Sequence, residues 1–230
     1  MYKQKELKKL EEKIGYEFKD KGLMIQALTH SSFSNEQKIN KFKNYERLEF
    51  LGDAVLELLS SRFFFETYTD MSEGQMTRMR SSMVCEPALA FCARDLSLGD
   101  FILLGKGEEA TGGRTRDSII SDVMEAVIGA IYLDGGIEKA SQFVQKFILS
   151  DLEDKQLFYD SKTILQEKVQ KEGQDLVYKL ISENGPDHDK IFVVEAVIDG
   201  RVAGKGQGRN KKAAEQQAAY QVLLKQKSKA

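Results

Sequence analysis

The stretch that decides the fold is YERLEFLGDAVLELLSSRFFF, residues 45–65. Its apolar residues recur every three or four positions, which predicts a helix whose buried face carries Leu48, Leu51, Val55 and Leu59. At about 100° per residue, the acids collect on a different face, as Glu46, Glu49, Asp53 and Glu57. Like charges one turn apart repel by roughly 0.2–0.5 kcal/mol per pair, so this stripe is unusual for a face that only contacts water.

A second pair of acids lies in residues 118–133, which form a predicted helix with apolar side chains on almost every side. A helix of that composition is expected to be buried, yet it contains Asp122 and Glu125 three positions apart. A buried carboxylate requires a proton or a cation, because an unpaired charge is too costly in a protein interior. Small residues that would let another helix approach closely follow in the same segment: Ala126, Gly129 and Ala130.

Two helices that each present a carboxylate pair can form one four-carboxylate cluster, here of Glu49, Asp53, Asp122 and Glu125. Oxygen ligands without nearby His or Cys suit Mg²⁺, with Mn²⁺ as a substitute. Two such ions can prepare a water nucleophile and stabilise the attacking and leaving oxygens at a phosphate. A structural alternative stays open, in which the acids form buried salt bridges with Arg47, Arg78, Arg80 or Arg116. Glu46 and Glu57 are expected to be structural or solvated acids rather than ligands.

Charge is divided unevenly along the 230 residues, whose net charge is only −2. Residues 160–230 contain 13 Lys and Arg against 10 Asp and Glu, whereas residues 1–159 contain 21 against 26. A basic module beside an acidic one indicates that nucleic-acid binding and metal binding belong to different domains. The sequence has no run of about 18 apolar residues, and its N-terminus is charged. Both features favour a cytoplasmic protein without a membrane partner.

The pattern along the chain predicts an all-helical domain at 1–150, a linker at 151–159 and a small α+β domain at 160–228. In the α+β domain, helices are expected at 162–172 and 211–225, and strands at 176–182, 191–198 and 201–205. This α-β-β-β-α order predicts a three-stranded antiparallel sheet with both helices on one face. Asp199-Gly200 is typical of a tight hairpin between the second and third strands.

Several motifs together resemble the ribonuclease III family over nearly the whole chain. In the first domain these are ALTHSS at 27–32, ERLEFLGDAVL at 46–56, EGQMTR at 73–78, LGKGEE at 104–109, DVMEA at 122–126 and GAIYLDGG at 129–136. The second domain resembles a double-stranded RNA-binding domain, through KTILQE at 162–167, GPDHDK at 185–190 and GQGRNKKAAEQQ at 206–217.

The resemblance implies a homodimeric, metal-dependent endonuclease that cuts double-stranded RNA and needs no organic cofactor. It implies 5′-phosphate and 3′-hydroxyl ends with a short 3′ overhang, and a role in processing ribosomal and other RNA precursors. The four carboxylates named above match the family's metal ligands, of which Asp53 and Glu125 are the catalytic ones. Glu73 matches a possible accessory acid, and Phe50 matches an aromatic residue that is inserted into the partner subunit.

Contacts with RNA are expected in three places of the second domain, because proteins recognise duplex RNA by its shape, 2′-hydroxyls and phosphates. Gln166 and Glu167 on the first helix are candidates for 2′-hydroxyls, and the loop with Pro186 and His188 is a candidate for a minor groove. Phosphates are expected at the start of the last helix, at Arg209, Asn210, Lys211 and Lys212. Without the motif match, His188 and the two lysines would be interpreted as ordinary solvated residues.

Two other functions stay open at this point. A non-catalytic regulator that binds double-stranded RNA would use the acids only as scaffolding, but it has no need of Asp122 and Glu125 in a hydrophobic helix. A helical scaffold for protein interactions would have no need of the basic helix start at 209–212.

Overall fold

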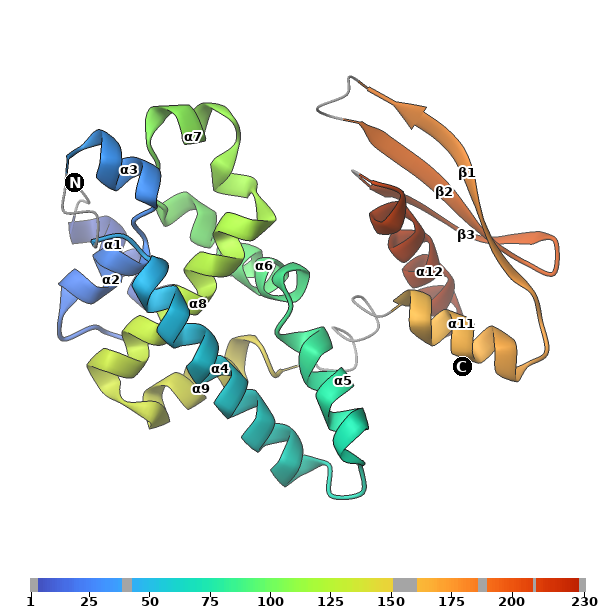
Figure 1. Cartoon of the computed structure of the whole chain (residues 1–230), viewed down its shortest axis with the longest axis horizontal. Helices are drawn as coiled ribbons and strands as arrows, with labels where there is room; N and C mark the ends of the chain where they lie inside the picture. Colours follow the sequence, from blue (N-terminus) through green and yellow to red (C-terminus); the bar gives the residue numbers. More distant parts are fainter. Residues whose placement is uncertain (1–3, 39–42, 151–160, 186–189, 209, 228–230) are drawn as a thin grey trace. The chain divides into compact units, whose positions relative to one another are not determined.

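A computed structural model describes residues 4–38, 43–150, 161–185, 190–208 and 210–227 of the chain (Figure 1). The chain divides into two compact units, residues 1–150 and 151–230. The predicted linker, 151–159, lies outside the described residues, so its bounds stay a prediction. None of the helices in the described part of the chain has the length and apolar character needed to cross a bilayer.

The first unit is helical, as the sequence predicts. Its α-helices are α1 (Gln4–Ile14), α2 (Lys21–Ala27), α3 (Ser31–Glu36), α4 (Glu46–Thr67), α5 (Glu73–Met83), α6 (Glu86–Asp95), α7 (Lys106–Ala110), α8 (Asp117–Gly135) and α9 (Ile137–Phe147). Two short 3-10 helices, Leu98–Phe101 and Gly113–Thr115, come before α7 and α8. A parallel β-bridge joins Thr29 to Leu103.

Helix α8 is the centre of this unit, because α2, α4, α6 and α9 all pack against it (Figure 1). Its backbone touches that of α4 directly. A Cβ atom on Gly52 would lie 1.8 Å from the Glu125 carbonyl oxygen, and a Cβ on Gly129 would lie 2.3 Å from the carbonyl oxygen of Leu48. The expected close approach at Gly129 is therefore confirmed, and Gly52 is its counterpart on α4.

Helix α4 buries Leu48, Val55 and Leu59 as predicted, while Leu51 is only partly buried. Another face of α4 leaves large apolar side chains in solvent: Phe50 is 81% exposed, Leu58 60% and Phe65 72%. Positions 50, 58 and 65 fall within about 80° of one another around a helix, so they form one apolar face.

The second unit contains α11 (Ser161–Lys171), β1 (Leu176–Asn184), β2 (Ile191–Ile198), β3 (Arg201–Gly208) and α12 (Lys211–Lys227). The three strands pair antiparallel in the order β1-β2-β3. A single core joins Leu165 and Val169 of α11, Ala196 of β2 and Ala218 of α12, so both helices cover one face of the sheet (Figure 1). The predicted α+β arrangement is confirmed.

Two strands are longer than predicted. Strand β1 continues past Ser182 to Asn184, after an irregularity in its pairing with β2 between Leu180 and Ser182. Strand β3 extends past Lys205 to Gly208, because its glycines lie directly beneath α12. A Cβ on Gly206 would lie 2.2 Å from the Ala218 nitrogen. Glycine is normally rare in strands, so the sequence pattern predicted too early an end for this strand.

The hairpin between β2 and β3 is confirmed. Asp199 and Gly200 both have positive φ, 49° and 76°, as the two central residues of a type I′ turn require.

Candidate active site

The contact between α4 and α8 brings together the four predicted carboxylates. Glu49 and Asp53 come from α4, and Asp122 and Glu125 come from α8. Because the two backbones touch at Gly52 and Gly129, charge is felt across the contact: Asp53 and Glu49 raise the pKa of Glu125, and Asp122 raises that of Glu49. This placement depends on a helix packing that was only partly expected from the sequence.

Burial raises the pKa of three of these acids, and repulsion by other acids of the cluster adds to the rise at Glu49 and Glu125. Burial, followed by the charges of Asp53, Glu49 and Asp122, raises the pKa of Glu125 from 4.5 to about 8. The pKa of Glu49 rises to about 7, mainly through burial and then through the charge of Asp122. Burial also raises the pKa of Asp122, against the opposing effect of a hydrogen bond from Tyr45. The cluster is therefore deficient in positive charge.

Two of the arginines named as alternative partners of the cluster pair with other acids. Nε of Arg80 lies 3.0 Å from Oε2 of Glu57, an ion pair without hydrogen-bond geometry. Nη1 of Arg80 donates a hydrogen bond to the Ser61 hydroxyl. Arg116 pairs with Glu108. Within the described residues, no salt bridge joins a basic side chain to any of the four carboxylates. Glu57 is thus a structural acid, as predicted.

The chemistry of the cluster fits a divalent cation, although the side chains do not yet converge on one point. In the part of the chain that is described, no three His, Cys, Asp or Glu side chains lie close enough together to hold one ion as placed. The donors are nevertheless hard carboxylate oxygens that repel one another without a basic partner. Such a set suits Mg²⁺ or Mn²⁺, and binding would require the carboxyl groups to draw closer together.

Tyr45 belongs to this site, and the sequence interpretation missed it. Its hydroxyl donates to Oδ2 of Asp122 at 3.2 Å, although the two residues are 77 positions apart. The side chain is buried, and its ring lies 5.6 Å from that of His30, centroid to centroid. Tyr45 immediately precedes α4, and the spacing of apolar and acidic residues does not distinguish it. Its position four residues before Glu49 was the available signal.

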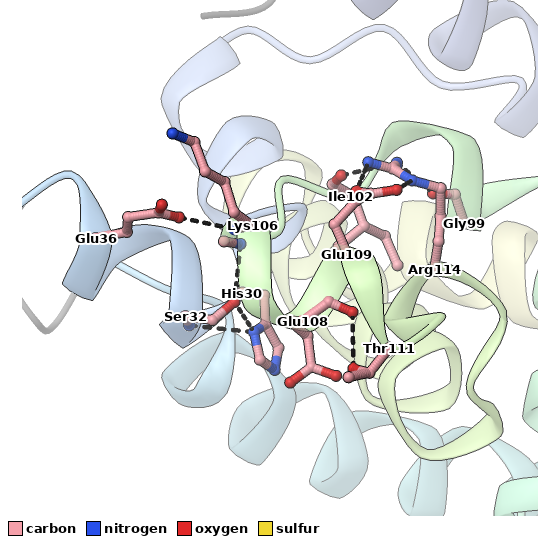
Figure 2. A network of polar contacts seen from close by, with 11 residues as sticks. His30, Ser32, Glu36, Gly99, Ile102, Lys106, Glu108, Glu109, Thr111 and Arg114 are labelled. Atoms are coloured by element: carbon pink, nitrogen blue, oxygen red, sulfur yellow. Dashed lines mark hydrogen bonds and ion pairs between the residues drawn. The ribbon is translucent and has the colours of Figure 1, made fainter.

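His30 is part of a polar network that joins α3 to the segment before α7 (Figure 2). The Ser32 backbone N–H donates to Nδ1 of His30 at 3.1 Å, and the Ser32 hydroxyl accepts from the Gly105 N–H at 2.9 Å. The Lys106 N–H donates to Oε2 of Glu36 at 2.8 Å. This network fixes the two motifs at 27–32 and 104–109 against each other beside Tyr45.

Glu73 takes a different position from the four carboxylates. It is exposed in the first turn of α5, where Oε1 accepts a hydrogen bond from the Thr77 hydroxyl at 3.0 Å. It lines a groove along α4 and α5 with Leu58 and Arg80, and its charge is not among those that shift the pKa of the cluster. Its accessory role stays a prediction.

The predicted RNA contacts lie on the exposed surface of the second unit wherever they are described. Gln166 and Glu167 are exposed on α11. Lys211 and Lys212 are exposed in the first turn of α12, and Oδ1 of Asn210 caps this helix by accepting from the Ala213 N–H at 2.8 Å. Three further predicted contacts, Pro186, His188 and Arg209, lie outside the described residues.

The raised pKa values predict how the stability of the metal-free protein depends on pH. Stability from protonated Glu49 and Glu125 is fully present below about pH 4.5 and is lost as the pH rises through about 7 and 8. The Glu125→Gln variant should therefore match the parent at pH 5 and be more stable at pH 9. Because Glu125 is partly solvated, we expect the difference in unfolding free energy to be only about 2 kcal/mol. This corresponds to a difference of roughly 4–8 °C in thermal midpoint.

Thermal unfolding in a chelator between pH 5 and 9 measures this difference. The exposed Glu138→Gln change is the control, since it removes the same charge outside the cluster. Equal midpoints for parent and Glu125→Gln at pH 9 would contradict the prediction.

Comparison with known proteins gives consistent similarities for both units. Residues 20–152 match the family described as ribonuclease-III-like, and residues 161–226 match the double-stranded RNA binding motif. The chain is 49% identical to Ribonuclease 3 of Caldanaerobacter subterraneus over 220 residues, 94% of this chain and 96% of that protein. It is 49% identical to Ribonuclease 3 of Anoxybacillus flavithermus over 223 residues, 96% of this chain and 94% of the relative.

A solved structure supports the architecture of the first unit. The nuclease domain of ribonuclease III from Campylobacter jejuni is 46% identical, with a TM-score of 0.58, over 62% of this chain and 95% of that one. That structure is described as showing flexibility in a region involved in dimer formation.

Proposed function

Because the chain belongs to the ribonuclease III family, we propose that this endonuclease hydrolyses double-stranded RNA with divalent metal ions, two at each active site. The products would have 5′-phosphate and 3′-hydroxyl ends with a short 3′ overhang. The observation that carries the proposal is the approach of Glu49 and Asp53 on α4 to Asp122 and Glu125 on α8, with no salt bridge to them from any basic side chain that the structure describes. Processing of ribosomal and other RNA precursors in the cytoplasm is the corresponding proposed role.

The chain's own residues hold and orient the groups that this reaction needs. When bound, Mg²⁺ or Mn²⁺ supplies an activated water and stabilises charge on the phosphate oxygens. Asp122 and Glu125 project from a helix whose neighbouring residues are almost all buried, so their backbone positions are rigid. The direct contact at Gly52 and Gly129 sets the separation of the two carboxylate pairs.

The second unit is proposed to hold the RNA duplex. At the start of α12, Lys211 and Lys212 add positive charge to a helix N-terminus whose backbone N–H groups already favour phosphate. The exposed Gln166 and Glu167 on α11 are polar side chains of the length needed to reach 2′-hydroxyls.

The most direct test is cleavage of a long, perfect RNA duplex with and without Mg²⁺. We expect cutting into short duplexes only with the ion, and no cutting of the matching single strand or of a DNA duplex. End labelling before and after phosphatase treatment identifies the 5′-phosphate. Binding of the RNA duplex without cutting in any divalent ion would favour the non-catalytic regulator instead.

A homodimer is proposed from the exposed apolar face of α4. Phe50 lies beside a groove whose lining includes Leu23, Leu51 and the half-exposed Leu133, so one protomer offers both a protruding ring and an apolar groove. A surface with both features is self-complementary under twofold symmetry. Two active sites would then act on one duplex, one for each strand.

Truncation of Phe50 is expected to weaken this dimer. Phe50→Ala should raise the dissociation constant at least about tenfold, as is typical for an aromatic anchor at an interface. Sedimentation equilibrium measures the constant, with Ile181→Ala as the control for loss of an exposed apolar side chain in the second unit. A Phe50→Ala protein that dimerises as tightly as the parent would remove this face from the interface.

Loss of the two lysines at the start of α12 is expected to weaken binding to duplex RNA of any sequence. Lys211→Ala with Lys212→Ala should reduce the salt dependence of the affinity by about one unit for each lost phosphate contact. Titrations at several salt concentrations measure the slope. Lys179→Ala with Lys205→Ala is the matched control, because it removes the same charge from β1 and β3. An unchanged slope would exclude Lys211 and Lys212 as phosphate contacts.

A further inference from the structure

Tyr45 connects the carboxylate cluster to a rigid part of the first unit. Its backbone N–H donates to the carbonyl oxygen of Thr29 at 2.9 Å, and Thr29 is itself bridged to Leu103. The preceding residue, Asn44, is buried, and its carbonyl oxygen accepts from the side chain of Gln26. Hydrogen bonds at Asn44 and at Tyr45 thus hold the backbone from which the phenol ring extends to the cluster.

Packing of the ring restricts Tyr45 further. The side chain is 4% exposed and lies against the ring of His30. The Ser32 N–H, which donates to Nδ1 of His30, fixes that ring in turn (Figure 2). A hydroxyl on a ring held in this way has little freedom, so its hydrogen bond to Oδ2 of Asp122 has a defined direction.

Asp122 differs from the other three carboxylates in having this donor. Within the described residues, no hydrogen bond reaches the carboxyl groups of Glu49, Asp53 or Glu125, whereas Asp122 accepts from Tyr45. One oxygen of Asp122 is therefore occupied, and the other is left for a further partner. A hydrogen bond to a ligating carboxylate orients it for its metal ion.

We propose that Tyr45 is a positioning residue, whose hydroxyl holds Oδ2 of Asp122 so that this carboxylate presents its other oxygen to a divalent cation. The inference rests on the proposed metal-dependent function and adds to it a residue outside the four carboxylates. Tyr45 acts through Asp122 and does not itself contact the substrate or the ion.

The Tyr45→Phe variant tests the hydroxyl alone, because the ring that packs against His30 is retained. We expect its affinity for Mn²⁺ to fall about tenfold, measured by calorimetry on the full-length protein without RNA. The Mg²⁺ concentration that half-saturates cleavage should rise by the same factor, while the rate at saturating Mg²⁺ approaches that of the parent. A merely structural role would not shift the metal requirement in this way.

Tyr16→Phe is the matched control, because the hydroxyl of Tyr16 also donates to an acid on α8. The hydroxyl of Tyr16 donates to Oδ2 of Asp134 at 2.7 Å, near the end of α8 and outside the cluster. This variant loses the same kind of hydrogen bond and should bind Mn²⁺ as the parent does. Adding Tyr45→Phe to Asp122→Asn should weaken Mn²⁺ binding no further than Asp122→Asn alone, because the hydroxyl acts through that carboxylate.

The outcomes separate this inference from the proposed function. A parent protein that neither binds Mn²⁺ nor cuts RNA would overturn the proposed function and the role of Tyr45 with it. A parent that does both, with unchanged Mn²⁺ affinity in Tyr45→Phe or additive losses in the double variant, would overturn the role of Tyr45 alone. A Tyr45→Phe protein that fails to fold while Tyr16→Phe folds would assign the hydroxyl a structural role and also overturn the inference.

Discussion

Replacing Glu125 with Gln is expected to slow the cleavage of duplex RNA at least about 100-fold while duplex binding is retained. Glu125 has the largest resolved pKa rise among the cluster acids, to about 8, because it is partly buried and lies near the other three acids of the cluster and Glu57. Glutamine keeps the size of the side chain but removes the negative charge that would attract a cation. The residues proposed to bind RNA belong to the second unit, so the substitution should leave them intact.

Two measurements on the same RNA separate chemistry from binding: single-turnover cleavage in Mg²⁺, and binding in a chelator. Glu138→Gln is the control for the loss of one carboxylate from the exposed surface of the first unit, and it should cut at the parent rate. A Glu125→Gln protein that gains stability at high pH, as expected, is folded, so its loss of cleavage would not be due to unfolding. Cleavage by Glu125→Gln at the parent rate would show that the catalytic assignment is wrong.

Replacing Gly52 with Ala is expected to destabilise the first unit by about 3 kcal/mol or more. The added methyl group would lie 1.8 Å from the carbonyl oxygen of Glu125. It would stand between the backbones of two helices that already touch at this point. The helices can accept it only by moving apart, which also separates Glu49 and Asp53 from Asp122 and Glu125. We therefore expect a lower thermal midpoint together with weaker divalent-ion binding.

Gly74→Ala is the matched control, because Gly74 is exposed in the first turn of α5 and a Cβ there meets no atom within 4 Å. In a helix that change should leave stability unchanged or raise it by up to about 1 kcal/mol. Denaturant unfolding of both variants gives the comparison. A Gly52→Ala protein as stable as the parent would mean that α4 and α8 do not pack with their backbones in contact.

The sequence by itself determined the features that depend on local spacing. Glu49 and Asp53, and likewise Asp122 and Glu125, lie about one helical turn apart, so the helical period alone places each pair on one side of its helix. The Asp199-Gly200 hairpin was equally predictable, because both of its turn residues must adopt positive φ. Each of these inferences needs only residues that are close in the chain.

Only the tertiary structure decided which residues far apart in sequence touch. The donor to Asp122 is Tyr45, the partner of Glu57 is Arg80 on the next helix, and Gly206 lies under α12. Tyrosine, arginine and glycine have many possible roles, and no periodicity selects among them. The choice follows from the distance between elements, which is set by the side-chain volume at their contacts: α4 and α8 approach to backbone contact because Gly52 and Gly129 have no side chain to separate them.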